Sequence, residues 1–234
     1  MIPWLRSTAS FPPLDRALAD PNGLLAASAD LTPERLLDAY RHGVFPWYSE
    51  GQPVLWWSPD PRMVLYVDEL RVSRSLRKTV RSGRFDIRVD SAFRQVMEGC
   101  AMAPRLGQLG TWITPQIVDA YCTLAREGFA HSVEAFEDGE LVGGLYGVAI
   151  GRMFYGESMF AQTADASKVA LVHLAAMLRS NAMPLIDCQQ DTPHLARFGA
   201  RPIPRIDFAR QLTALVNSPA PALWRPVPAF DAIA

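Results

Sequence analysis

Apolar residues recur at helical spacing in three stretches of the chain. Residues 32–43 begin with a Thr–Pro pair that suits a helix start, and they end at a glycine. Leu36, Leu37 and Tyr40 form the apolar stripe of this stretch. Similar signals recur at residues 114–128 and 167–179. We therefore predict three helices at these positions.

Residues 131–160 alternate between apolar and polar side chains, which is the pattern of β-strands. Asp138–Gly139 predicts a hairpin turn in this stretch, and Gly151 predicts a second turn. A short apolar run at residues 184–189 predicts one more strand. The resulting order of helix, three strands, helix and strand indicates a mixed sheet flanked by helices.

The segment after the first helix is rich in tryptophan and proline. Trp47, Trp56 and Trp57 lie within residues 43–65, together with four prolines. These tryptophans are either core residues or a surface on which a nucleobase stacks. The composition turns from aromatic to basic between residues 60 and 75, so we expect a domain boundary there.

The composition of the 234-residue chain is 49% hydrophobic and 20% charged, as in globular proteins. The sequence has no basic start followed by an apolar run, and no stretch approaches the length of a membrane span. The three cysteines are widely spaced, which suits a reducing compartment. Neither they nor the four histidines have zinc-ligand spacing. We expect a cytoplasmic protein without a bound metal.

The formal net charge of -1 conceals a basic run at residues 71–88. This run contains seven basic residues and one acid, and the turn Ser82–Gly83 divides it. Such a pattern is either a solvated helix face or a surface that binds phosphates. The candidates for nucleic-acid contact are Arg74, Arg77, Lys78, Arg81 and Arg84.

Polar residues follow the apolar strand in PLIDCQQD, residues 184–191. Because side chains alternate along a strand, Asp187 and Gln189 share one face and Cys188 lies on the other. We interpret Cys188 as a packed structural residue, since a thiol nucleophile needs a nearby base. Glu157, in the expected hairpin, belongs to the same predicted sheet. Two carboxylates and an amide can bind a cation, orient an amine or accept a proton, or they can form a structural network.

Eight blocks of sequence resemble the leucyl/phenylalanyl-tRNA–protein transferase family, and they occur in the family's order. The blocks are PNGLLA (21–26), GVFPWYS (43–49), LWWSPDPR (55–62), GTWIT (110–114), LVGGLYGVAIG (141–151), GESMF (156–160), ASK (166–168) and LIDCQ (185–189). The chain departs from the expected pattern at Ser28–Ala29, in place of a glycine pair, and at residues 106–109, in place of a charged run.

The resemblance implies an α+β fold. We expect a small N-terminal α/β domain at residues 1–65 and an N-acetyltransferase-like mixed-sheet domain at residues 66–234. The implied activity is transfer of Leu or Phe, and less well Met, from aminoacyl-tRNA to proteins beginning with Arg or Lys, which marks them for degradation. We expect no cofactor and a monomer.

The resemblance also assigns roles to single residues. Asp187 and Gln189 match the catalytic pair, with Asp187 acting either as a base or as an oriented acceptor, and Glu157 matches an acid near the acceptor amine. The aromatic residues implied to hold the terminal adenosine are Trp47, Trp112 and, as a weaker candidate, Tyr121. The residues implied to form the aminoacyl pocket are Leu145, Phe154, Met159, Leu171, Leu174, Leu178 and Ile186. The basic run is implied to meet the tRNA backbone.

Three other functions are compatible with parts of the sequence. An acyl-coenzyme A transferase of the same fold would carry a glycine-containing pyrophosphate loop, but residues 160–171, FAQTADASKVAL, have no glycine. A non-catalytic RNA-binding module would use only the basic run and the tryptophans. A cysteine hydrolase would use Cys188.

Overall fold

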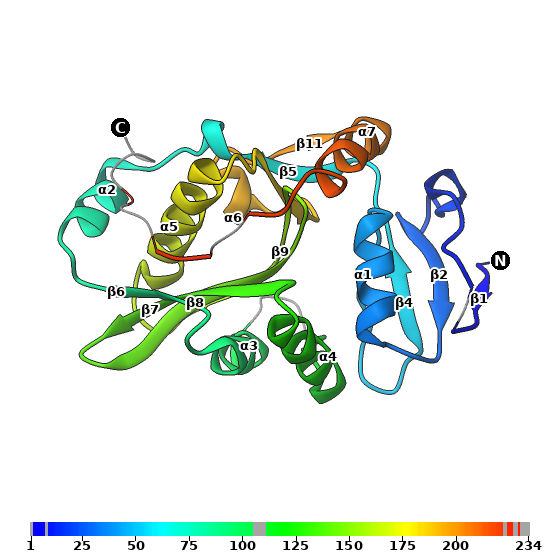
Figure 1. Ribbon diagram of the computed structural model, residues 1–234, viewed down its shortest axis with the longest axis horizontal. Helices are drawn as coiled ribbons and strands as arrows, with labels where there is room; N and C mark the ends of the chain where they lie inside the picture. The colour runs from blue at the N-terminus through cyan, green and yellow to red at the C-terminus, as the bar shows by residue number, and fades with distance from the viewer. Residues whose placement is uncertain (1, 8, 105–110, 222–223, 227–228, 230–234) are drawn as a thin grey trace.

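The structure, a computed structural model, describes residues 2–7, 9–104, 111–221, 224–226 and 229 (Figure 1). Two sheets organise these residues. A four-stranded sheet has the order β1-β2-β4-β3, and a seven-stranded sheet has the order β11-β5-β10-β9-β8-β7-β6. The departure from the family pattern at residues 106–109 lies outside the described residues.

The N-terminal part is the small sheet with helix α1 packed beside it. Thr32 caps α1 as predicted, because its side-chain oxygen accepts a hydrogen bond from the Arg35 amide. Trp56 is fully buried, and its indole nitrogen donates to the Ser28 hydroxyl, so this departure from the family pattern has a structural partner. The elements of this part are β1 (Trp4–Leu5), η1 (Leu14–Arg16), β2 (Leu24–Ser28), α1 (Pro33–Arg41), β3 (Phe45–Pro46) and β4 (Val54–Trp57).

The second sheet contains the strands that the alternating pattern predicts. Asp138 and Gly139 both have positive φ at the β7–β8 turn, and Gly151 does so at the β8–β9 turn, so both predicted turns are confirmed. β10 pairs in parallel with β9 and antiparallel with β5, which makes the sheet mixed. The strands are β5 (Arg62–Tyr66), β6 (Asp86–Val89), β7 (Ala130–Glu137), β8 (Glu140–Ile150), β9 (Met153–Ala161), β10 (Leu185–Gln189) and β11 (Arg201–Ile203).

Helices cover both faces of this sheet (Figure 1). α3 and α4 contribute to the core on one face, with Tyr146 of β8, whereas α2 and α5 contribute to the core on the other, with Leu145. The three predicted helices correspond to α1, α4 and α5. The helices of this part are η2 (Val67–Glu69), α2 (Arg74–Arg81), α3 (Phe93–Met102), α4 (Pro115–Arg126), α5 (Ala166–Ser180), α6 (Pro193–Ala196) and α7 (Arg205–Val216).

The two parts of the chain share a core. The change from the first sheet to the second falls between Trp57 and Arg62, and the division into domains at residue 65 stays a prediction. Tyr40 of α1 and Tyr121 of α4 belong to one continuous cluster of buried side chains. A site at this junction can therefore draw side chains from both parts. The predicted α+β class, with a mixed sheet flanked by helices in the second part, is confirmed.

No helix among the described residues is long and apolar enough to cross a membrane.

Candidate functional site

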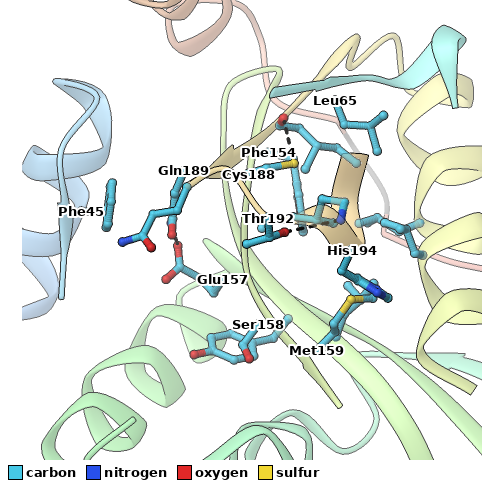
Figure 2. Close-up of a pocket in the computed structure, with 18 of the residues that line it drawn as sticks. Phe45, Leu65, Phe154, Glu157, Ser158, Met159, Cys188, Gln189, Thr192 and His194 are labelled. Carbon is cyan, nitrogen blue, oxygen red and sulfur yellow. Dashed lines mark hydrogen bonds between the residues drawn. The ribbon is translucent and has the colours of Figure 1, made fainter. Parts of the chain in front are cut away.

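A cavity lies where strands β9 and β10 separate. The two strands run in parallel only as far as the pair Asp187 and Tyr155. Beyond this pair, β9 continues to Ala161, while β10 ends at Gln189 after a bulge. Residues of both strands beyond the last pair line a cavity of about 340 Å³ (Figure 2). This volume is typical of sites that bind small ligands or parts of larger ones.

Most of the cavity wall is apolar. Six of the seven residues expected to form the aminoacyl pocket line it: Leu145, Phe154, Met159, Leu171, Leu174 and Ile186. The seventh, Leu178, is fully buried on α5 and lies outside the cavity wall. Leu65 of β5 also lines the cavity, although sequence reasoning did not single it out. The apolar side chains of the sheet and of α5 thus form one chamber.

The segment after β10 closes part of the chamber and was missed by sequence reasoning. Its lining residues are Gln190, Thr192, His194 and Leu195. Burial lowers the pKa of His194, and the neighbouring Lys168 acts in the same direction. The Thr–Pro pair at residues 192–193 is a helix-start signal that was available in the sequence, and Thr192 indeed caps the short helix α6.

Glu157 forms the polar end of the cavity. Its Oε1 accepts a hydrogen bond from Gln189 Nε2 at 2.7 Å and another from the Tyr40 hydroxyl at 2.7 Å. Its Oε2 accepts from the Tyr121 hydroxyl at 3.2 Å. Figure 2 shows the Glu157 and Gln189 side chains pointing toward one another beside Phe45. The carboxylate is therefore held by neutral donors and not by a cation.

Burial raises the pKa of Glu157 to about 7. The negative charge of Asp187 acts in the same direction, and the hydrogen bonds from Tyr40, Gln189 and Tyr121 oppose the rise. A carboxylate with such a pKa exchanges protons near neutral pH. Glu157 can thus serve as a proton acceptor inside the cavity.

Two buried tyrosines hold this carboxylate. Tyr40 comes from α1 and Tyr121 from α4, and their hydroxyls also contact each other. Burial, reinforced by the charge of Glu157, raises the pKa values of both hydroxyls well above the usual range, so they remain protonated donors. Tyr121 was expected to contact adenosine, but it lies behind Glu157 and does not line the cavity. Both parts of the chain build the site.

Asp187 is placed differently from Glu157. Both its oxygens are bound by Arg62, with Nε at 2.8 Å from Oδ1 and Nη2 at 2.7 Å from Oδ2. Oδ1 also accepts a hydrogen bond from the backbone amide of Gln189 at 2.9 Å. The carboxylate is fully buried and does not line the cavity. Of the expected catalytic pair, Gln189 lines the cavity, and Asp187 lies outside the cavity wall and accepts a hydrogen bond from the Gln189 backbone amide.

Arg62 was not singled out from the sequence. It is fully buried at the start of β5, with its guanidinium carbon 4.8 Å from the Phe45 ring centroid and 4.6 Å from that of Phe208. The available signal was an arginine beginning the apolar run RMVLY, since a buried cation requires a partner. Tyr40 could be suspected in the same way, because a buried tyrosine hydroxyl needs a hydrogen bond.

Cys188 faces the chamber and packs against the core on the α5 side. Burial is the main cause that raises the pKa of its thiol far above the usual value, and the charge of Asp187 adds to it. The thiol is a weak donor to the Ile186 carbonyl oxygen at 3.8 Å. A protonated thiol without an adjacent base is a poor nucleophile, which argues against a cysteine hydrolase.

Two tryptophans stand at the cavity. Trp47 and Trp112 both line it, as expected for residues that meet a nucleoside. The Trp57 ring packs against Trp47 with centroids 5.5 Å apart, and its indole nitrogen donates to the Trp47 carbonyl oxygen at 2.7 Å. Trp57 therefore fixes the backbone and the ring of Trp47, while Trp56 belongs to the core.

The basic run forms a second hollow, which we call the basic surface. Arg74, Arg77, Lys78 and Arg81 of α2 line this hollow of about 820 Å³ together with Val72 and Ser82. Arg84 differs from them because its guanidinium contacts the Glu137 carboxylate through two nitrogens. Across the described part of the chain, His, Cys, Asp and Glu side chains form no group of three or more that could hold a metal ion.

The chain aligns with known proteins over most of its length. A leucyl/phenylalanyl-tRNA–protein transferase of Thiobacillus denitrificans is 61% identical over 215 residues, covering 92% of this chain and 94% of that protein. The same-named protein of Nitrosomonas eutropha is 58% identical over 219 residues, covering 94% and 93%. Among solved structures, L-PGS from Bacillus licheniformis aligns over 72% of this chain and 53% of that chain, with a TM-score of 0.38 and 12% identity.

Family descriptions match both parts of the chain. Residues 64–213 match the family described as leucyl/phenylalanyl-tRNA protein transferase, and residues 29–60 match the N-terminal domain of that family. These ranges contain Glu157, Asp187 and Gln189 in the second part and Tyr40 in the first. The chain belongs to the leucyl/phenylalanyl-tRNA–protein transferase family, and it is an aminoacyltransferase enzyme.

Proposed function

We propose that this enzyme transfers Leu or Phe, and less well Met, from aminoacyl-tRNA to the N-terminal amino group of proteins that begin with Arg or Lys. The transfer marks those proteins for degradation, and it takes place in the cytoplasm on a monomeric enzyme. One observation carries the proposal: an apolar chamber ends at a carboxylate whose pKa is about 7. This arrangement suits an apolar aminoacyl group next to an attacking amine.

The aminoacyl end of the tRNA fits the two halves of the cavity. The side chain of Leu, Phe or Met enters the apolar chamber beside Leu171 and Leu174, and the terminal adenosine stacks on Trp47 and Trp112. The ester carbon then lies at the polar end, near Glu157. Shape selects the side chain in this arrangement, because the chamber wall offers few polar groups to its apolar end.

The reaction is direct aminolysis of an ester that is already activated. The neutral α-amine of the acceptor protein forms a new C–N bond, and the bond from the carbonyl carbon to the ribose oxygen breaks. Glu157 accepts the proton that the amine loses and returns it to the leaving ribose oxygen. Gln189 and the two tyrosines fix the carboxylate for both transfers. The mechanism needs neither a covalent enzyme intermediate nor a cofactor.

Asp187 assists this reaction as an oriented acceptor and not as the base. Arg62 occupies both its oxygens, and its remaining contact holds the Gln189 amide. Its negative charge also raises the pKa of Glu157, although burial has the larger effect. Asp187 and Gln189 thus work together, with Gln189 as the member that meets the substrate.

The basic surface is the proposed contact for the tRNA backbone. Arg74, Lys78 and Arg81 are exposed on one side of α2, and Arg77 is half-buried between them. Lysine and arginine side chains attract phosphates without reading sequence. Arg84 is the weakest member of the proposed set, because Glu137 already neutralises it.

Mass spectrometry of a peptide substrate tests the proposed function. A peptide beginning with Lys should gain one leucyl residue at its N-terminus when incubated with enzyme and Leu-tRNA. The same peptide with an acetylated N-terminus should gain none, and a peptide beginning with Ala should react poorly. An unmodified Lys peptide would contradict the proposal, and modification by an acyl-coenzyme A donor would support the alternative transferase.

A further inference from the structure

A continuous line of contacts runs from the junction of the two sheets to the cavity. Arg62 binds both oxygens of Asp187, and Asp187 Oδ1 accepts the backbone amide of Gln189. The Gln189 side chain then donates to Glu157 Oε1. Each step lies between 2.7 and 2.9 Å, so each is a well-formed hydrogen bond.

Gln189 needs support from such contacts. Its φ of 62° lies in the left-handed region, which residues with a Cβ rarely adopt. Gln189 pairs with Met63 of β5 only after a register shift that follows Asp187, so the regular ladder is interrupted at this residue. A backbone in this conformation persists only where neighbouring groups hold it. The hydrogen bond from its amide to Asp187 Oδ1 is such a support.

Arg62 is itself packed between two aromatic rings. Its side chain is fully buried, and its guanidinium lies close to the rings of Phe45 from the first sheet and Phe208 from α7. A buried ion pair is weak evidence for stability, since apolar side chains often replace it without loss. Its position directly behind Gln189, which lines the cavity, therefore points to a role in geometry.

We propose that Arg62 is a positioning residue for the transfer reaction. Acting through Asp187, it fixes the backbone of Gln189 and so aims the Gln189 amide at Glu157. The inference deepens the proposed function, because it assigns a residue to the same site. Arg62 does not line the cavity, so it acts on the reaction through Asp187 and Gln189.

Replacing the ion pair with apolar side chains tests this role. The double variant Arg62→Met with Asp187→Leu should fold, with a thermal melting curve close to that of the wild type. Its kcat should fall on the order of 10- to 100-fold, while KM for Leu-tRNA should change less than about threefold, since misplacement of a catalytic group affects the reacting geometry. Arg62→Lys keeps the charge but cannot form the bidentate contact with Asp187. Its kcat should therefore lie between those of the wild type and the double variant.

The position of Gln189 can be measured without the reaction. In the wild type, the ¹⁵N and ¹H resonances of its side-chain amide should report a hydrogen bond to a carboxylate, and in the double variant they should move to the values of a free amide. This readout separates failure of the proposed function, in which no transfer occurs, from failure of the positioning role.

Arg205→Met is the matched control. The Arg205 guanidinium donates a hydrogen bond to the Ser58 carbonyl oxygen, between the two sheets, but Arg205 lies outside the cavity wall. Its kcat and the Gln189 resonances should stay unchanged. A folded double variant with the wild-type kcat and Gln189 resonances would overturn the proposal. If the double variant does not fold, Arg62→Lys with wild-type kcat and resonances would overturn it equally.

Discussion

The cavity and the basic surface are both hollows, but they are built in opposite ways. The cavity, of about 340 Å³, has walls of core side chains, with one half-buried carboxylate at its end. The basic surface, of about 820 Å³, consists mainly of side chains of a single helix, and three of its four cations are exposed. The first can select a ligand by shape and chemistry, and the second can attract one by charge.

This contrast separates two kinds of mutational effect. Changes in the cavity should alter the rate of the chemical step and the choice of aminoacyl group, without altering the salt dependence of binding. Changes on the basic surface should alter tRNA affinity and its salt dependence, without altering the choice of aminoacyl group. Each prediction below tests one side of that separation.

The largest effect is expected from Glu157→Gln. This nearly isosteric change keeps the hydrogen-bonding positions but removes the proton acceptor, so single-turnover transfer from Leu-tRNA should slow by about 10²–10⁴-fold. The affinity for tRNA should remain within about twofold of wild type, because the phosphate contacts are unchanged. Quench-flow measurement of the transfer rate, with filter binding for the affinity, checks both statements.

Glu134→Gln is the matched control for this experiment. Burial likewise raises the pKa of Glu134, and its carboxylate also accepts hydrogen bonds from neutral donors, Ser91 and Ser132. Glu134 also accepts from the Ala92 amide at the start of α3 and lies outside the cavity wall. Its variant should transfer normally. Equal losses in both variants would contradict the role of Glu157 as the proton acceptor in the cavity.

Selectivity among aminoacyl groups should show the next largest effect. Leu, Phe and Met are unbranched at Cβ and can bend into the chamber, whereas the Cβ methyl of Ile or Val is stiff at χ1 and should clash. Transfer from Ile-tRNA should therefore be about 10- to 200-fold slower than from Leu-tRNA in kcat/KM. Comparable rates from the two tRNAs would contradict selection by shape.

Leu174→Ala sharpens the same test. Leu174 lines the chamber and is almost fully buried, so the substitution enlarges the space next to the aminoacyl side chain. Transfer of Leu should weaken and the discrimination against Ile should narrow. Leu178→Ala is the control on the same helix: it lies outside the cavity wall, so it should lower stability without changing the ratio of Leu to Ile.

The transfer rate should change by about tenfold for each pH unit below the pKa of Glu157. The carboxylate form of Glu157 is the proton acceptor, so protonation of Glu157 below about pH 7 should lower the transfer rate by roughly tenfold for each further pH unit. The Glu157→Gln variant should lack this limb. The α-amine of the peptide titrates at about 7.7–8.0 and should give a second limb in both proteins. An unchanged limb near pH 7 in the variant would assign the proton to another group.

Local sequence patterns predicted the helices, strands and turns that build this site, but they did not predict which side chains from different elements contact each other. The caps and apolar spacing of α1 and α4, and the turns around β8, were readable because each depends on residues close in sequence. The alternation of β10 likewise placed Asp187 and Cys188 on opposite faces, but its prediction that Gln189 shares the face of Asp187 was wrong, because Gln189 lines the cavity together with Cys188. These signals state which face a side chain occupies.

The partners of those side chains depend on contacts that periodicity does not encode. Tyr40 reaches Glu157 across 117 positions in the chain, and Arg62 reaches Asp187 across 125. Both contacts follow from how α1 docks on α4 and how β5 pairs with β10. Gln189 also has a positive φ at the bulge. This conformation interrupts the alternation of side chains along β10, so alternation does not predict the direction of the Gln189 side chain.

The smallest effect is expected on the basic surface. Each cation that contacts a phosphate adds about one unit to the slope of log affinity against log salt, so replacing Arg77 and Lys78 with Ala should flatten this slope by about two units. Arg94→Ala removes a charge from α3, outside the basic surface, and should leave the slope unchanged. Titration of tRNA binding at several salt concentrations measures the slope. The ratio of Leu to Ile transfer should be the same in all these proteins, because the cavity is untouched. An unchanged slope in the Arg77 and Lys78 variant would show that tRNA contacts another surface. An altered ratio of Leu to Ile transfer would show that the basic surface influences the cavity, which contradicts the separation of the two regions.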